Sequence, residues 1–172
     1  ASSQKHKPVN LVDLMNHSVE LSDNHLNLRI DDGATKRINI IKHYESDIVE
    51  ASCSAAEIQQ VVLNIISNAA QSFSITSFSS DFLPTITITL ESINNNAKII
   101  IQDNGQGMSD TTKRHLFEPF FTTKDVGKGT GLGLSVSYFS ITEHHNGKIA
   151  VDSTLNEGST FTITLPQLTE NH

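Results

Sequence analysis

Residues 54–73 read SAAEIQQVVLNIISNAAQSF and are the most strongly patterned segment of the chain. Ser54 followed by Glu57 has the spacing of a capping box, in which two side chains satisfy free N–H groups at the start of a helix. Apolar residues then recur at helical spacing, at Ile58, Val61, Val62, Ile65 and Ala69. The segment therefore predicts an amphipathic helix over residues 54–73 that buries one face.

The opposite face of this predicted helix is polar but almost uncharged, and it carries Gln60, Asn64, Ser67, Asn68 and Gln71. A solvated face usually carries Lys and Glu, which are better helix formers than Asn and pair favourably one turn apart. Asn64 and Asn68 could instead offer amide oxygens to a hard cation such as Mg²⁺. An ordinary surface role is the competing interpretation, and this face alone does not decide between the two.

The segments on either side predict strands and helices in mixed order. Upstream, a looser amphipathic helix is predicted over residues 13–26 and a strand over residues 38–44. Downstream, strict alternation predicts a strand with one wet face over residues 85–90. Residues 99–101 are continuously apolar, which predicts a strand buried on both faces.

A second helix is predicted over residues 132–145, with Val136 and Phe139 facing inward and a left-handed stop at residues 146–147. Two further strands are predicted on either side of the turn at residues 156–158. Because strands and helices do not alternate regularly, the chain predicts an α/β sandwich, in which one mixed, largely antiparallel sheet is covered on one face by helices.

The composition limits the possible classes of function. The chain has 172 residues, 37% of them hydrophobic, which suits one domain with its own core. A formal charge of −7 argues against a nucleic-acid partner, because such binders need clustered Lys and Arg. No apolar run approaches the ~20 residues of a membrane span, so a soluble domain is predicted. Residues 1–10 predict the tail of a linker, residues 11–166 the domain, and residues 167–172 a C-terminal tail.

Two glycine-rich segments predict places where the backbone comes close to a neighbour. Asp103 ends a predicted strand and is followed by Gly105 and Gly107, and its carboxylate could accept a hydrogen bond from an amino group such as adenine N6. An ordinary turn is the alternative for this short motif. Residues 127–135 read GKGTGLGLS at the start of a predicted helix, where free N–H groups and the helix dipole favour phosphates. Its spacing matches neither the dinucleotide nor the P-loop fingerprint.

Four segments, in this order, resemble the asparagine, first glycine, phenylalanine and second glycine boxes of two-component sensor histidine kinases. They are Asn64-Ile-Ile-Ser-Asn68-Ala69, Asp103-x-Gly105-x-Gly107, Phe117-Glu-Pro-Phe-Phe-Thr-Thr-Lys124 and Gly129-Thr-Gly-Leu-Gly-Leu134. The resemblance covers nearly the whole chain and is far more specific than any single motif. It implies the Bergerat ATP-binding fold of the GHKL superfamily.

The resemblance also implies a role for each matching residue. Asp103 would receive adenine N6, with the hydroxyl of Ser159 close by, and Asn64 and Asn68 would hold Mg²⁺ against the phosphates. Asn64 and Lys124 would serve catalysis, and residues 122–130 would form a lid. The residues implied to bind ATP are Asn64, Asn68, Asp103, Gly105, Gly107, Lys124, Lys128, Gly129, Thr130, Gly131, Leu132, Gly133, Leu134 and Ser159.

The activity implied by the resemblance is transfer of the γ-phosphoryl group of Mg·ATP to a histidine on a separate domain. That phospho-accepting domain would lie upstream, and a response regulator would act downstream. The fragment would be a cytoplasmic monomer, and the full kinase a homodimer, either free or anchored in the inner membrane. His144 and His145 are not predicted acceptors, because no acidic residue follows either one; both are predicted to lie on the surface at a helix end.

Two other classes of function remain as alternatives. A self-contained GHKL ATPase would need a base to activate water, but the helix position that carries Glu in those members is Asn64 here, and an amide is no base at neutral pH. A nucleotide-sensing or anti-sigma-type serine kinase module would lack the phenylalanine box at residues 117–124. The sequence therefore favours the histidine kinase.

Overall fold

The computed structural model describes residues 6–29, 35–74, 81–119 and 133–167. In chain order the elements are β1 (Lys7–Asn10), α1 (Leu11–Leu21), the 3₁₀ turn η1 (Asp23–Leu26), β2 (Asn27–Arg29), β3 (Thr35–Arg37), β4 (Asn39–Tyr44), β5 (Glu50–Cys53), α2 (Ala55–Ser74), β6 (Thr85–Ile93), β7 (Asn96–Asp103), α3 (Asp110–His115), α4 (Gly133–Phe139), the π-helical turn η2 (Ser140–His144), β8 (Lys148–Thr154) and β9 (Gly158–Pro166).

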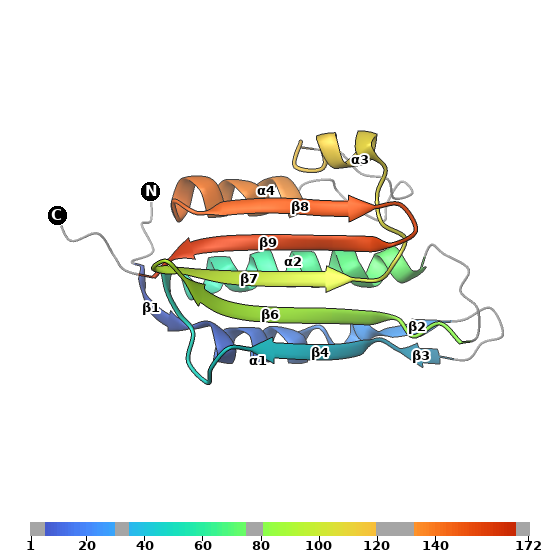
Figure 1. The fold of residues 1–172 in the computed structure, drawn as a ribbon, viewed down its shortest axis with the longest axis horizontal. Helices are drawn as coiled ribbons and strands as arrows, with labels where there is room; N and C mark the ends of the chain where they lie inside the picture. Colours follow the sequence, from blue (N-terminus) through green and yellow to red (C-terminus); the bar gives the residue numbers. More distant parts are fainter. Residues whose placement is uncertain (1–5, 30–34, 75–80, 120–132, 168–172) are drawn as a thin grey trace.

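The centre of the molecule is a five-stranded sheet with the order β4-β6-β7-β9-β8. The β4–β6 pair is parallel, and the three other pairs are antiparallel. Helices α1, α2 and α4 cover one face of this sheet (Figure 1). The predicted α/β sandwich with a mixed, largely antiparallel sheet is therefore confirmed. In the described parts of the chain, no helix is long and apolar enough to cross a membrane.

The core fills the space between α2 and the covered face of the sheet. From β6, β7 and β9 the alternating residues Ile86, Ile88, Leu90, Ile99, Ile101, Phe161, Ile163 and Leu165 are buried there. The Thr residues between those of β6 stay partly exposed on the other face. The prediction that residues 99–101 are buried on both faces is wrong for Ile100, which is only half-buried: α1, α2 and α4 all lie on the opposite face of the sheet.

Helix α2 forms as predicted and is the longest described helix. The backbone N–H of Glu57 donates to Ser54 Oγ at 3.3 Å, so Ser54 caps the helix start. The predicted apolar face, Ile58, Val61, Val62, Ile65 and Ala69, is buried. This burial leaves the asparagine face beside the core rather than in it.

The second predicted helix forms, but its inward face is not the predicted one. Val136 and Phe139 are 56% and 53% exposed, whereas Ser137, Ser140 and Ile141 are buried. The two serines lie against α2 and accept or donate hydrogen bonds there, because their short side chains let the two helices approach closely. The helix then ends through a π turn, with Asn146 in the left-handed region at φ 52° as predicted.

The N-terminal residues of the description also form structure. Residues 7–10, within the predicted linker tail, make strand β1, which pairs antiparallel with β5. Asn10 then caps α1, since its Oδ1 accepts from the N–H of Val12 at 3.1 Å. The path into the domain is thus tied down immediately ahead of α1.

Candidate functional site

Asn64 lies at the meeting point of α2 and α4. Its Nδ2 donates to the carbonyl oxygen of Gly133 at 3.2 Å and to Ser137 Oγ at 3.1 Å. Its Oδ1 accepts from Gln60 Nε2, one turn earlier, at 3.0 Å. The structure therefore brings the asparagine box against the first residue of α4, where the second glycine box ends.

Asn68 lies one turn further along the same face of α2 and is half-buried. Within the described parts of the chain its side chain makes no hydrogen bond. Its amide is therefore available to a ligand. Asn64 Oδ1 lies one turn away and accepts from Gln60, a bond that a metal ion could replace. Together the two asparagines offer the neutral oxygen ligands that suit Mg²⁺.

Asp103 ends β7 and is 5% exposed. It lies opposite Ile86 of β6 and Ser159 of β9 in the sheet register. The backbone N–H of Gly105 donates to its Oδ1 at 2.9 Å. Burial raises the pKa of Asp103 from 3.8 to about 6, although backbone hydrogen bonds from Gly105 and Ser159 act in the opposite direction. A carboxylate held in such a place is costly unless a ligand pairs with it.

Ser159 lies beside Asp103, as the resemblance implies, and it is joined there by Ser153, which the sequence analysis missed. The two hydroxyl oxygens are 2.8 Å apart, and Ser153 Oγ accepts from the N–H of Met108 at 2.8 Å. Ser153 occupies an inward position of β8 that alternation assigns to an apolar side chain. That mismatch with the strand pattern is the signal that could have found it.

Gly105 and Gly107 are needed for packing against the protein itself. A Cβ on Gly107, where φ is +70°, would lie 2.0 Å from the carbonyl oxygen of Thr154 in the β8–β9 turn. A Cβ on Gly105 would lie 2.3 Å from Ser72 Oγ. That hydroxyl instead accepts from the N–H of Gln106 at 2.9 Å. The first glycine box is thus clamped between the end of α2 and the turn after β8.

The described part of the second glycine box is the start of α4. Gly133 is exposed, and Leu134 is half-buried against the core. The predicted lid over residues 122–130 lies outside the described residues. So do Lys124, Lys128, Gly129, Thr130, Gly131 and Leu132.

The start of the phenylalanine box packs onto the sheet and α4. The ring of Phe117 meets Phe161 of β9 edge-on at 6.5 Å between centroids and lies 5.2 Å from the ring of Tyr138. The next residue, Glu118, places its Oε1 at hydrogen-bond distance, 2.9 Å, from His115 Nδ1. The asparagine box and the described parts of the other three boxes therefore lie on or against α2 and α4.

Comparison with known proteins places these boxes in a family context. The model of a family described as histidine kinase-, DNA gyrase B- and HSP90-like ATPase matches residues 53–169. Sporulation kinase E of Bacillus subtilis (strain 168) is 33% identical over 159 residues, which are 90% of this chain and 18% of that kinase. The chain thus spans about a fifth of the length of this curated relative.

Solved structures share the fold. The nucleotide-free catalytic domain of histidine kinase ThkA has a TM-score of 0.75 at 24% identity, covering 95% of this chain and 99% of that one. ThkA in complex with the response regulator protein TrrA has a TM-score of 0.73 at 22% identity, covering 97% and 43%. Full-length ShkA in complex with AMPPNP has a TM-score of 0.75 at 20% identity, covering 100% and 34%.

Proposed function

The chain belongs to the histidine kinase-, DNA gyrase B- and HSP90-like ATPase family, and we propose that it binds Mg·ATP and transfers the γ-phosphoryl group to a histidine on a separate domain. The observation that carries this proposal is the double attachment of α2, the helix that bears the asparagine face. One attachment joins Asn64 to Gly133 at the start of α4, and the other joins Ser72 to Gln106 in the first glycine box. The first glycine box and the start of α4, where the second glycine box ends, are therefore both held against α2.

Asp103 supports adenine as the base of the nucleotide. Its carboxylate is buried at a strand end and already accepts from backbone N–H groups. A remaining lone pair can accept a hydrogen bond from an exocyclic amino group. Adenine N6 donates at that position, whereas guanine presents the acceptor O6. Ser153 Oγ accepts from Met108 N–H and donates to the carbonyl oxygen of Gly158, so Ser159 gives its proton to Ser153 and keeps a lone pair that can accept from the base.

Asn68 and Asn64 fit a magnesium ion in the proposed complex. Neutral amide oxygens leave most of the coordination shell to water and phosphate, which is how Mg²⁺ usually binds in proteins. The ion would neutralise charge on the transferring phosphoryl group. In the proposal this chain positions the nucleotide and its γ-phosphate, and Lys124 and Lys128 also contact the phosphates.

The acceptor and partner follow from the same family. In the proposal the phospho-accepting histidine sits on an upstream domain of a homodimeric kinase, and the phosphoryl group then passes to a response regulator in the cytoplasm. The complex of ThkA with TrrA supports such a partner. The self-contained ATPase is disfavoured, since Asn64 uses its amide to bind Gly133 and Ser137 and has no basic group to offer water.

The test is phosphoryl transfer in the full-length kinase. We expect γ-labelled ATP to label the upstream histidine only when Mg²⁺ is present. Asn68→Ala should abolish labelling and Mg²⁺-dependent binding of a fluorescent ATP analogue, while circular dichroism shows an intact fold. Asn24→Ala, which removes an exposed asparagine on η1, is the matched control. Unchanged labelling in Asn68→Ala would refute the metal role, and steady ATP hydrolysis without a labelled histidine would favour the ATPase.

A further inference from the structure

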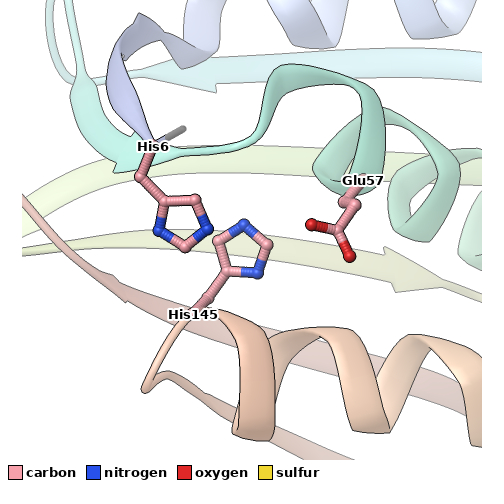
Figure 2. A group of neighbouring side chains, drawn as sticks. All are labelled: His6, Glu57 and His145. Carbon is pink, nitrogen blue, oxygen red and sulfur yellow. The ribbon is translucent and has the colours of Figure 1, made fainter. Parts of the chain in front are cut away.

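A group of polar side chains outside the proposed nucleotide site lies at one end of the helical layer, where α2 begins and η2 ends. His6, Glu57 and His145 have ligand-type atoms within 4.8 Å of one another (Figure 2). They come from the residue before β1, from the first turn of α2 and from the residue after η2. His145 is 3% exposed, which contradicts the predicted surface position.

The arrangement of the two rings does not suit a metal ion. The imidazole rings of His6 and His145 stack with centroids 4.4 Å apart and an interplanar angle of 7°. Both ring nitrogens of His145 are already used: Nδ1 contacts the carbonyl oxygen of Ser140 at 2.8 Å, and Nε2 contacts the N–H of Ser54 at 3.1 Å. A metal ligand at His145 would have to break one of these bonds.

The two partners of His145 fix its chemical form. A carbonyl oxygen can only accept and an amide N–H can only donate, so Nδ1 carries the proton and the unprotonated Nε2 accepts from Ser54. His145 thus donates within its own helix end and accepts from the residue that caps α2. One neutral imidazole joins the last turn of η2 to the first turn of α2.

This bond belongs to a series of polar contacts at three levels along α2 and the α4–η2 helix. At the next position, Glu57 Oε1 contacts Ser140 Oγ at 3.3 Å and His144 Nδ1 at 2.6 Å. At the far end, Asn64 contacts Gly133 and Ser137. The pairing runs from Ser54 with His145 to Asn64 with Gly133, so the two helices are antiparallel. A shift of either helix by one turn, about 5.4 Å, would break all three contacts.

We propose that His145 is a positioning residue that fixes the register of α4 against α2 and thereby holds the glycine-rich helix start against Asn64. Apolar side chains between helices tolerate sliding, whereas buried polar pairs must be matched or left unsatisfied. The role rests on the proposed function, because it matters only if the start of α4 faces the phosphates. The ring of His6 stacks on the ring of His145 and covers the tie, that is, the hydrogen bond from the N–H of Ser54 to His145 Nε2. His6 directly precedes β1, which pairs with β5.

The tie requires an uncharged His145. Burial lowers the pKa of this imidazole, and the carbonyl of Ser140 opposes that shift. The titratable groups that face it are His6 ahead of β1, Glu57 on α2 and His144 on η2.

The neighbouring strands β5 and β8 carry a buried thiol and exposed charged side chains. Burial raises the pKa of the Cys53 thiol at the end of β5 to about 11, and the charged side chains of Lys148 and Asp152 on β8 are exposed to solvent. Because its pKa in the folded protein lies below the ordinary 6.5, His145 stays neutral at pH 7, and acid below that lowered pKa breaks the bond to Ser54.

The decisive test compares two amide substitutions in the chain. In His145→Gln the side-chain amide reaches the place of Nε2 and can still accept from Ser54, but it carries no titratable proton. In His145→Asn the shorter amide reaches only the place of Nδ1, so the contact within η2 survives and the contact to α2 is lost. We expect the Kd for a Mg·ATP analogue to stay within about twofold in His145→Gln and to rise about tenfold in His145→Asn.

The pH profile separates positioning from simple stability. Wild-type affinity should fall in acid more steeply than that of His145→Gln, whose remaining pH dependence belongs to other groups such as Asp103. His6→Ala should leave the tie intact but expose it, so the acid loss should begin at a higher pH than in the wild type. Equal affinity and equal pH profiles in the two amide variants would overturn the proposal.

A spectroscopic measurement on the wild-type chain covers the case in which both variants unfold. Imidazole ¹⁵N shifts should show the Nδ1–H form at pH 7, and the Ser54 amide should titrate together with His145. An Nε2–H form would overturn the tie. A wild-type chain that binds no ATP analogue would refute the proposed function instead, while leaving the tautomer and the amide titration as the test of the tie.

Discussion

Asp103→Asn should make the nucleotide-free protein more stable and the nucleotide complex weaker. The carboxyl is 5% exposed, and its folded pKa of about 6 lies above the ordinary 3.8. The folded protein therefore takes up this proton before the unfolded chain does. The contribution of Asp103 to the free energy of unfolding is therefore highest below pH 4 and decreases as the pH rises through 6.

The magnitude comes from that difference in pKa. A rise of roughly two units corresponds to about 3 kcal/mol of destabilisation at neutral pH. Asparagine removes this penalty and keeps one oxygen for the N–H of Gly105. Its amino group would face the second backbone donor, at Ser159, which costs about 1 to 2 kcal/mol. The net expectation is a gain of about 1 to 2 kcal/mol at pH 7.

The nucleotide complex should change in the opposite direction. An amide must turn its oxygen toward adenine N6 and loses the charge assistance of the carboxylate, which is worth about 1.5 to 3 kcal/mol. The Kd for an ATP analogue should rise by about ten- to a hundredfold. This opposition between stability and binding is the expected mark of a carboxylate kept for a ligand.

Urea unfolding and ATP-analogue titration at pH 7 and pH 4.5 measure both effects. The measurement at pH 4.5 is the internal control. At that pH Asp103 is protonated in the folded wild type, so most of the stability deficit of the wild type relative to Asp103→Asn should disappear. The reasoning is refuted if the variant is less stable than the wild type at pH 7, or if it binds the analogue equally well. Competition by GTP as strong as that by ATP would also show that Asp103 does not read N6.

The remaining predictions concern packing. Gly107→Ala should lower the free energy of unfolding by at least ~2 kcal/mol in a urea titration, since its Cβ would overlap the Thr154 carbonyl and its φ is positive; an unchanged midpoint would contradict the clamp. Phe139→Ser should change stability by no more than about 0.5 kcal/mol in the same titration, because that ring is exposed. Cys53 should resist thiol reagents in the native protein at pH 8 and react only on unfolding, because burial raises its pKa to about 11.

Much of the fold could be predicted because several independent sequence signals indicate the same structure. In residues 54–73 the cap, the apolar spacing and the uncharged polar face all indicate one helix with one buried side, and α2 has those bounds within a residue. The Thr–Ile alternation of β6 fixes its two faces in the same way. Local pattern sufficed where each side chain meets the sheet or solvent.

The second helix shows where that reasoning fails. Hydrophobicity alone turns Val136 and Phe139 inward, whereas the structure buries Ser137 and Ser140. Their partners, Asn64 and Glu57, are more than 70 residues away in sequence. A helix that packs through hydrogen bonds to another helix carries no apolar stripe at the contact. Its phase becomes visible only when both helices are in place.

His145 and Asp103 represent the two ways in which this fold accommodates buried polar groups. His145 has a partner for each ring nitrogen, so burial costs it little and the bonds determine how two helices align. Asp103 has backbone donors but a raised pKa, which means that its bonds do not repay the loss of water. A buried group whose bonds are all satisfied needs no ligand to explain it, whereas a buried carboxyl with a raised pKa is a candidate for ligand binding. By this criterion we propose Asp103 as a ligand-binding group and His145 as part of the frame around the proposed site.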